Sequence, residues 1–199
     1  MTSDSAEMQA GRTRDPDLTA RILDETARQL GERGYSALRI EHIASAIGSG
    51  KTAIYRRWPG KPELVAALLA SRQQTGSVPD TGSVVDDLVE HAWQNVQNQT
   101  FSGTDAETSR IRSAMVQPEV YELYSTDFLD KRRRIGIEIL EKGVRRSELP
   151  EDTDMQLVLQ LLAGLVLYRT TLGQEATTRD QLQRVVAALV ESPPRRAAG

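Results

Sequence analysis

Apolar residues recur every three or four positions along most of the 199-residue chain, and this spacing is typical of helices rather than strands. One such stretch begins at Asp15-Pro16, an aspartate cap followed by a proline that suits the first helical position. Lys61-Pro62 begins another stretch in the same way. The turn-rich residues 75–82 separate these N-terminal stretches from those that follow. The pattern predicts an all-α fold of about nine helices.

Residues 38–61 contain two short helical patterns joined by a glycine turn. Ile40, Ile43 and Ile47 keep helical spacing until Gly48-Ser49-Gly50 interrupts it. Two glycines around a serine do not continue a helix, so the chain must turn sharply at this point.

The second pattern has two different faces. Ile54 and Trp58 lie four positions apart and share one face, while Lys51, Tyr55 and Arg56 lie toward the other. The first face can pack against a core, and the second can contact a DNA groove. The segment therefore predicts a helix-turn-helix whose second helix reads DNA.

These residues resemble the TetR family of bacterial transcriptional regulators. The first helix of that family ends in a glycine and an aromatic residue, and the first helical stretch of this chain likewise ends in Gly34-Tyr35. The matching residues of the helix-turn-helix are Ile43-Ala44, Gly48, Lys51, Ile54-Tyr55, Arg56, Trp58-Pro59 and Lys61. The departures from the family pattern are Ser49, Gly50, Thr52 and Ala53. The preferred base sequence is therefore not transferable from relatives.

The resemblance implies a three-helix DNA-binding head at residues 12–61 and a larger helical body at residues 62–195 for effector binding and dimerisation. The charge distribution agrees with this division. The head has ten Lys or Arg against six Asp or Glu, whereas residues 62–199 have fifteen against twenty. The net charge of −3 therefore conceals a positively charged head. Such a head suits DNA, because phosphate contacts supply most of the non-specific affinity.

Side chains of the second short helix are the expected DNA contacts. Base edges are assigned to Lys51, Thr52 and Ala53, since the N-terminal part of a recognition helix lies nearest the bases. The expected phosphate contacts are Arg39, Tyr55, Arg56 and Lys61. Arg12 and Arg14 are expected to form a flexible arm that reaches a minor groove.

The same segment contains a competing motif. Residues 48–52, GSGKT, resemble the end of a phosphate-binding P-loop. The full motif needs a glycine where this chain has Ser45, and a buried strand where residues 38–47 have helical spacing. A P-loop-like nucleotide-binding enzyme is therefore the weaker alternative. No catalytic triad, carboxylate pair or metal-ligand set stands out, so we expect no enzymatic activity, no cofactor and no metal site.

The last two helical patterns are expected to form a dimer interface. Residues 157–168 are apolar at nearly every position, so this helix must be covered on two sides. The resemblance implies a four-helix interface built by two helices of each subunit, and burial in a monomer core is the alternative. The expected interface residues are Leu157, Leu161, Gly164, Leu165, Leu182, Val185, Val186 and Leu189.

Large side chains of the body are candidates for an effector pocket, which the resemblance places in this region. These candidates are Trp93, Gln97, Arg112, Met115, Tyr121, Tyr124, Phe128 and Tyr168. An aromatic residue at helical spacing also packs in an ordinary core, so both interpretations stay open for each. We interpret Lys131–Arg134 as a solvated helix face and His91 as a packing histidine.

Composition narrows the functional classes. The absence of cysteine excludes disulfides and thiolate chemistry, and only two histidines are present. No apolar run reaches the roughly 18 residues of a membrane span, and the polar N-terminus is unlike a signal peptide, so we expect a soluble cytoplasmic protein. The expected function is a homodimeric repressor that leaves a palindromic double-stranded DNA operator when a small-molecule effector binds. A constitutive DNA binder and a helical interaction module remain alternatives.

Overall fold

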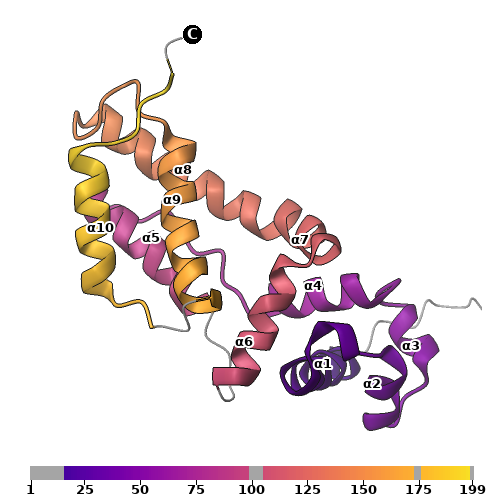
Figure 1. Cartoon of the computed structure of the whole chain (residues 1–199). Coiled ribbons are helices and arrows are strands. Elements are labelled where there is room, and N and C mark those ends of the chain that lie inside the picture. Colours follow the sequence, from indigo (N-terminus) through magenta and orange to yellow (C-terminus); the bar gives the residue numbers. More distant parts are fainter. Residues whose placement is uncertain (1–15, 99–104, 173–175, 198–199) are drawn as a thin grey trace, which may run out of the picture.

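The computed structural model describes residues 16–98, 105–172 and 176–197. The all-α prediction is confirmed, with ten α-helices within these residues where about nine were expected. In these three segments the only β pairing is an isolated bridge between Thr153 and Arg195. Figure 1 shows an elongated molecule with α3 at one end and α10 at the other. None of the helices so described is long and apolar enough to cross a membrane.

The helix-turn-helix lies at one end of the molecule. It follows α1 (Pro16–Ala37) and consists of α2 (Ile40–Ala46) and α3 (Lys51–Tyr55). Ile43 of α2 and Ile54 of α3 are both fully buried in the core that these helices share. The apolar spacing in the sequence therefore corresponds to the packed side of the motif.

Two glycines determine where the chain of this region turns. Gly34 has φ 75° and ψ 170°, so helical backbone is interrupted three residues before the assigned end of α1. Gly48 has φ 64° in the turn between α2 and α3. Residues with a Cβ are strained at such positive φ values, whereas glycine is not. The turn of the helix-turn-helix therefore depends on Gly48.

The hydrophobic core of the head continues into the middle of the chain. α4 (Lys61–Ser71) packs against α1 and α7 (Pro118–Tyr124), and α6 (Asp105–Ser113) packs along α1. Buried residues of all these helices belong to one cluster, which also includes Met115 of the 3-10 turn after α6. The predicted boundary between residues 61 and 62 therefore does not separate two hydrophobic cores.

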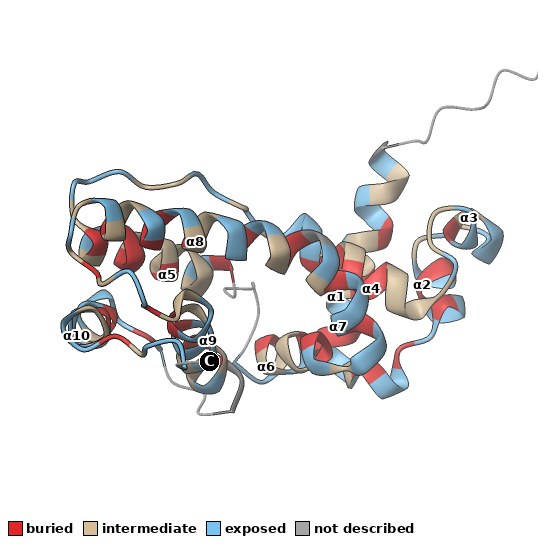
Figure 2. Cartoon of the chain, turned by 90° about the horizontal axis from the view of Figure 1, so that it is seen from above, coloured by how far each residue is buried: buried red, intermediate tan, exposed pale blue. Residues whose placement is uncertain are grey.

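A second hydrophobic cluster holds the other end of the molecule together. It is built by α5 (Val84–Asn98), α8 (Asp130–Arg145), α9 (Met155–Leu167) and α10 (Arg179–Glu191). A π-helical turn at Ser125–Leu129 connects α7 directly to α8. Figure 2 shows the buried residues of these helices on the sides that face one another. One nearly continuous helical run thus links the two clusters.

Direct contacts join the head to α6 and α7. The Arg110 guanidinium donates to the Gly31 carbonyl at 2.8 Å, and the Tyr35 hydroxyl donates to Glu119 Oε1 at 3.0 Å. A Cβ placed on Gly31 would lie 3.2 Å from Cβ of Glu107, so α1 and α6 approach closely there. The head is therefore in direct contact with both α6 and α7.

Candidate functional site

The position of α3 is fixed by its buried side. Ile54 is fully buried, and the partly buried Trp58 packs against the same cluster four residues later. At the start of the helix, the Gly50 carbonyl accepts a hydrogen bond from the Ala53 amide at 2.9 Å. The Arg21 guanidinium donates to the Ile47 carbonyl at 2.6 Å and thereby holds the end of α2. These contacts orient a helix of only five residues.

The opposite side of α3 is open to solvent. Lys51, Thr52, Tyr55 and Arg56 are exposed, and Ala53 is partly exposed. Figure 2 shows α3 as a largely exposed helix at the edge of the molecule. These five predicted DNA contacts thus form one outward surface, whose polar and basic side chains can donate hydrogen bonds. An α-helix with such a surface fits the major groove of B-DNA.

Two predicted phosphate contacts already have hydrogen-bond partners in the head. The exposed Arg39 donates through Nη1 to the carbonyls of Ser36 at 2.7 Å and Leu38 at 3.1 Å. Lys61 Nζ donates to the Tyr35 carbonyl at 3.1 Å and lies 4.1 Å from the centroid of the Tyr35 ring. Burial lowers the pKa of Lys61. Lys61 therefore ties the start of α4 to α1, and its ammonium group has further N–H donors beyond the one used here.

The DNA-binding prediction also included Arg12 and Arg14. Both lie outside the residues that the structure describes.

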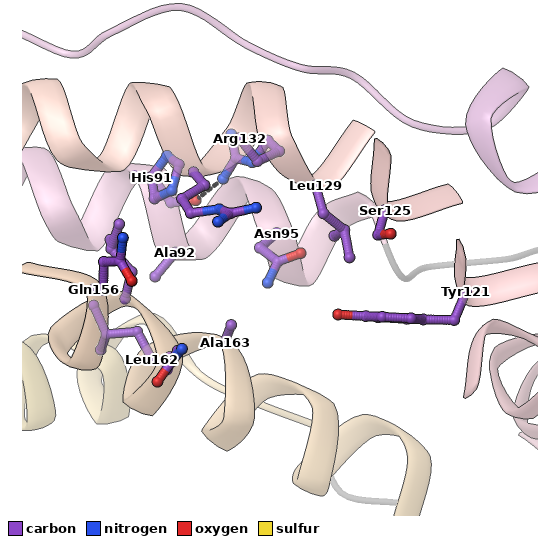
Figure 3. A pocket seen from close by; sticks show the side chains of 13 residues that line it. His91, Ala92, Asn95, Tyr121, Ser125, Leu129, Arg132, Gln156, Leu162 and Ala163 are labelled. Carbon is purple, nitrogen blue, oxygen red and sulfur yellow. Dashed lines mark hydrogen bonds between the residues drawn. The ribbon is translucent and has the colours of Figure 1, made fainter. Parts of the chain in front are cut away.

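A cavity of about 320 Å³ lies in the body between α5, α8, α9 and the segment from α7 into the π-helical turn. Figure 3 shows side chains from all these elements converging on it. The lining residues are His91, Ala92, Asn95, Tyr121, Ser125, Leu129, Arg132, Arg133, Gln156, Leu159, Gln160, Leu162 and Ala163. The combination of apolar walls with a few polar groups is typical of small-molecule sites.

Of the eight residues proposed from the sequence for an effector pocket, only Tyr121 lines this cavity. Tyr124 and Phe128 are buried and stack on each other with ring centroids 5.4 Å apart. The Tyr124 hydroxyl donates to the Gln73 side chain. Met115 is buried in the same cluster. Three of the candidates therefore belong to the core that joins the head to α6 and α7.

The other four candidates also lie away from the cavity. Trp93 is partly buried against the second hydrophobic cluster, and Gln97 is exposed on α5. Arg112 donates through Nη1 to the Thr170 carbonyl at 2.9 Å, and Tyr168 is 62% exposed beyond the end of α9. The size of a side chain and its place in the body were therefore not enough to predict which residues line the cavity.

Arg132 is one of the cavity-lining residues that were not predicted from the sequence. It was grouped with a solvated basic run, yet it is only 6% exposed. It shares a helical face with the buried Gly136 and Ile139, at spacings of four and seven residues. This spacing was readable in the sequence and would have placed Arg132 on the packed side of α8.

Arg132 connects α8 to α5 and to the segment that follows α4. Its Nη1 donates to the Thr75 carbonyl at 2.9 Å and to Gln94 Oε1 at 2.9 Å, and its Nη2 donates to the His91 carbonyl. Burial lowers the pKa of Arg132 to about 10, so its guanidinium is still cationic at neutral pH. The cavity therefore has a buried positive charge in its wall.

His91 lies beside this charge and is neutral. Burial, and secondarily the Arg132 charge, lowers the pKa of His91 to about 3. Its Nδ1 atom is buried and has no hydrogen-bond partner among the described residues. His91 both packs and lines the cavity, and it adds no second positive charge at neutral pH.

α9 has an apolar face on each of two sides. Val158, Leu162 and Val166 are buried against the neighbouring helices of the same chain. On the other side, Leu157 is 39% exposed and Leu161 is 46% exposed. The outer apolar stripe, which we define as Leu157, Leu161, Gly164 and Tyr168, follows the helix at spacings of three or four residues. Within the described chain this stripe is left uncovered.

The helix α10 contributes less apolar surface than expected. Leu182 and Val186, both assigned to the dimer interface, are fully buried within the chain's own second cluster. Val185 and Leu189 are partly buried against the same cluster, as is Leu165 of α9. Leu182 and Val186 are therefore not available to a second copy, whereas the other three residues keep some exposed surface.

Comparison with known families and proteins agrees with this architecture. Residues 22–68 match the family described as bacterial regulatory proteins, tetR family, and residues 78–189 match the tetracyclin repressor-like C-terminal domain. The chain is 33% identical over 183 residues to the HTH-type transcriptional regulator AqdR of Rhodococcus erythropolis. That match covers 89% of this chain and 86% of AqdR.

Solved structures show the same fold. MexZ, a key repressor responsible for antibiotic resistance in Pseudomonas aeruginosa, superimposes with a TM-score of 0.63 at 19% identity, covering 90% of this chain and 98% of MexZ. The flavonoid-responsive regulator FrrA gives a TM-score of 0.63 at 21% identity, covering 89% of this chain and 95% of FrrA.

Proposed function

The chain belongs to the TetR family of bacterial transcriptional regulators, and we propose that it is a homodimeric repressor released from a palindromic operator by a small-molecule effector. Its family consists of DNA-binding regulators and not of enzymes. The observation that carries the proposal is the outward surface of α3, whose polar and basic side chains stand on a helix anchored by the buried Ile54.

In this proposal the start of α3 reads base edges. Lys51, Thr52 and Ala53 occupy that position, and Tyr55 and Arg56 follow one turn later, where they contact phosphates. Arg39 and Lys61 both lie beside the end of α1 and contribute further phosphate contacts. Two copies related by a two-fold axis would place their α3 helices in successive major grooves of a palindrome.

The outer apolar stripe of α9 supports the dimer. A contiguous exposed apolar patch often indicates a protein–protein interface. Leu157 and Leu161 give this surface its apolar area, and a Cβ built on Gly164 meets nothing within 4 Å, so a second helix can approach closely there. Leu165, Val185 and Leu189 keep part of their surface exposed on α9 and α10.

The cavity in the body supports regulation by a small molecule. The similar fold of FrrA, a flavonoid-responsive regulator, and of MexZ, a repressor, agrees with effector release and with repression. Tyr121 lines the cavity on α7, and two residues earlier Glu119 accepts the Tyr35 hydrogen bond from the head. A ligand that binds better when α7 is displaced would therefore favour a different head position.

Binding-site selection with genomic fragments tests the DNA-binding part. The wild-type protein should enrich a palindrome, and the exposed Tyr55→Ala should weaken binding to all sequences while the protein stays dimeric. Thr52→Val should instead change the enriched sequence. Unaltered affinity of Tyr55→Ala across a salt titration would contradict this docking.

A constitutive DNA binder is the alternative function. It predicts that the operator affinity is the same with and without every compound that occupies the cavity. Fluorescence anisotropy of a labelled operator, measured with increasing compound, separates the two functions.

A further inference from the structure

The effector cavity has basic, neutral polar and apolar walls but no acidic wall. None of the thirteen described residues that line it carries a carboxyl group. Arg132 and Arg133 contribute guanidinium groups, Asn95 and Gln156 contribute amides, and leucines such as Leu159 contribute apolar surface. The lining therefore suits a ligand whose polar group is negative or an acceptor.

The charge of Arg132 is not neutralised by the residues around it. Its hydrogen bonds go to two backbone carbonyls, those of Thr75 and His91, and to the side-chain amide of Gln94. These acceptors satisfy N–H groups but carry no negative charge. Among the electrostatic influences on Arg132, no carboxylate of the described chain is found. A buried charge without a counter-ion is costly, and a bound anion would reduce that cost.

Arg133, the neighbour of Arg132, differs in this respect. Its guanidinium is ion-paired with Asp130 one turn earlier on α8, and its side chain is 55% exposed. Its charge is therefore largely compensated and screened. The electrostatic preference of the cavity depends mainly on Arg132.

Resting on the effector role proposed above, we propose that this cavity binds a small organic monoanion, in which one carboxylate is attached to an apolar body. Figure 3 shows Arg132 and His91 on the wall formed by α5 and α8, with Leu162 and Ala163 of α9 on the facing wall. The carboxylate lies toward Arg132, and the apolar body lies against the leucines. A volume of about 320 Å³ suits a single ring or a short alkyl chain.

Isothermal titration calorimetry of the full-length protein without DNA tests this ligand class. The probes are octanoate and phenylacetate, each beside its amide and its trimethylammonium counterpart of the same body. At least one anion should bind ten-fold or more tightly than its amide, and the cations should bind more weakly still. The proposal is overturned if neither anion binds, or if the amides bind as tightly as the anions.

A charge-introducing variant tests whether the anion occupies this cavity. Gln160 is exposed and lines it, so Gln160→Glu leaves the fold unchanged but adds a negative charge to the wall. Repulsion should weaken anion binding about five- to ten-fold, as expected for charges several ångströms apart in a partly solvated site. The control Gln97→Glu adds the same charge at an exposed position outside the cavity and should have no effect. Equal weakening by both variants, or by neither, would overturn the assignment.

The operator anisotropy assay separates this inference from the proposed function. Selective anion binding in calorimetry without operator release supports the ligand class and contradicts effector control. Operator release by the amide or the cation, with no binding of the anions, supports effector control and contradicts the ligand class.

Discussion

Leu161 and Leu162 are neighbours on α9 that face opposite surroundings. Leu161 is 46% exposed on the outer apolar stripe, whereas Leu162 is 4% exposed in the second hydrophobic cluster. Replacing each with alanine removes the same atoms from two different places. Leu161→Ala therefore reports on the proposed dimer interface, and Leu162→Ala reports on the fold of the single chain.

The size of each effect follows from the burial. Fully burying a leucine side chain contributes about 1.5–3 kcal/mol, and roughly half of Leu161 remains to be buried by a partner. Leu161→Ala should therefore cost about 1 kcal/mol per copy, or about 2 kcal/mol per dimer, which weakens dimerisation about 30-fold. Leu162→Ala should lower the free energy of unfolding by about 2–5 kcal/mol, because it leaves a cavity in the core.

Sedimentation equilibrium over a dilution series measures the first effect, and urea unfolding at a fixed low concentration measures the second. Leu161→Ala should shift the dissociation constant of the dimer and leave unfolding of the monomer unchanged. If Leu161→Ala dimerises as tightly as the wild type, the outer stripe of α9 is not the interface.

Three further predictions concern stability and coupling. Gly143→Ala should lower the free energy of unfolding by about 1–3 kcal/mol, because the new Cβ would lie 2.6 Å from Cγ2 of Val84; an unchanged urea midpoint would contradict this packing. The depressed pKa of His91 should cost about 2 kcal/mol of stability between pH 7 and pH 5, since the unfolded chain takes up a proton near pH 6.5 that the folded chain takes up only near pH 3. Urea unfolding at both pH values should show a smaller loss for His91→Gln, and an equal loss would contradict the burial of a neutral imidazole. Tyr35→Phe removes the hydrogen bond to Glu119, worth about 1 kcal/mol, and should reduce effector-dependent release from the operator in the anisotropy assay; unchanged release would exclude this contact from the coupling.

The helix-turn-helix could be predicted from the sequence because its signals are local. The glycine at position 48 sets the turn, and the four-residue spacing of Ile54 and Trp58 sets the buried side of α3. Once the buried side of α3 is known, the helical repeat places the exposed side, which we propose faces DNA, opposite to it. The sequence also shows that α9 is apolar. Only the structure shows which of its two apolar sides is buried within the chain and which is exposed.

The cavity could not be predicted in the same way. The π-helical turn at Ser125–Leu129 adds a residue to the helical repeat, so the faces of α7 and α8 cannot be extrapolated through it. Tyr124 and Phe128 have the spacing and size of pocket residues, but such residues also pack in a core, and here they do. Which side of a helix faces a cavity depends on contacts between helices far apart in the sequence.

The central claim is that two copies of the chain read one palindrome through the exposed side of α3. Native mass spectrometry of the protein with its selected operator duplex measures this directly. The account predicts two chains per duplex for the wild type, and free dimers with little duplex bound for Tyr55→Ala. A complex of one chain per duplex, or full duplex binding by Tyr55→Ala, would contradict it.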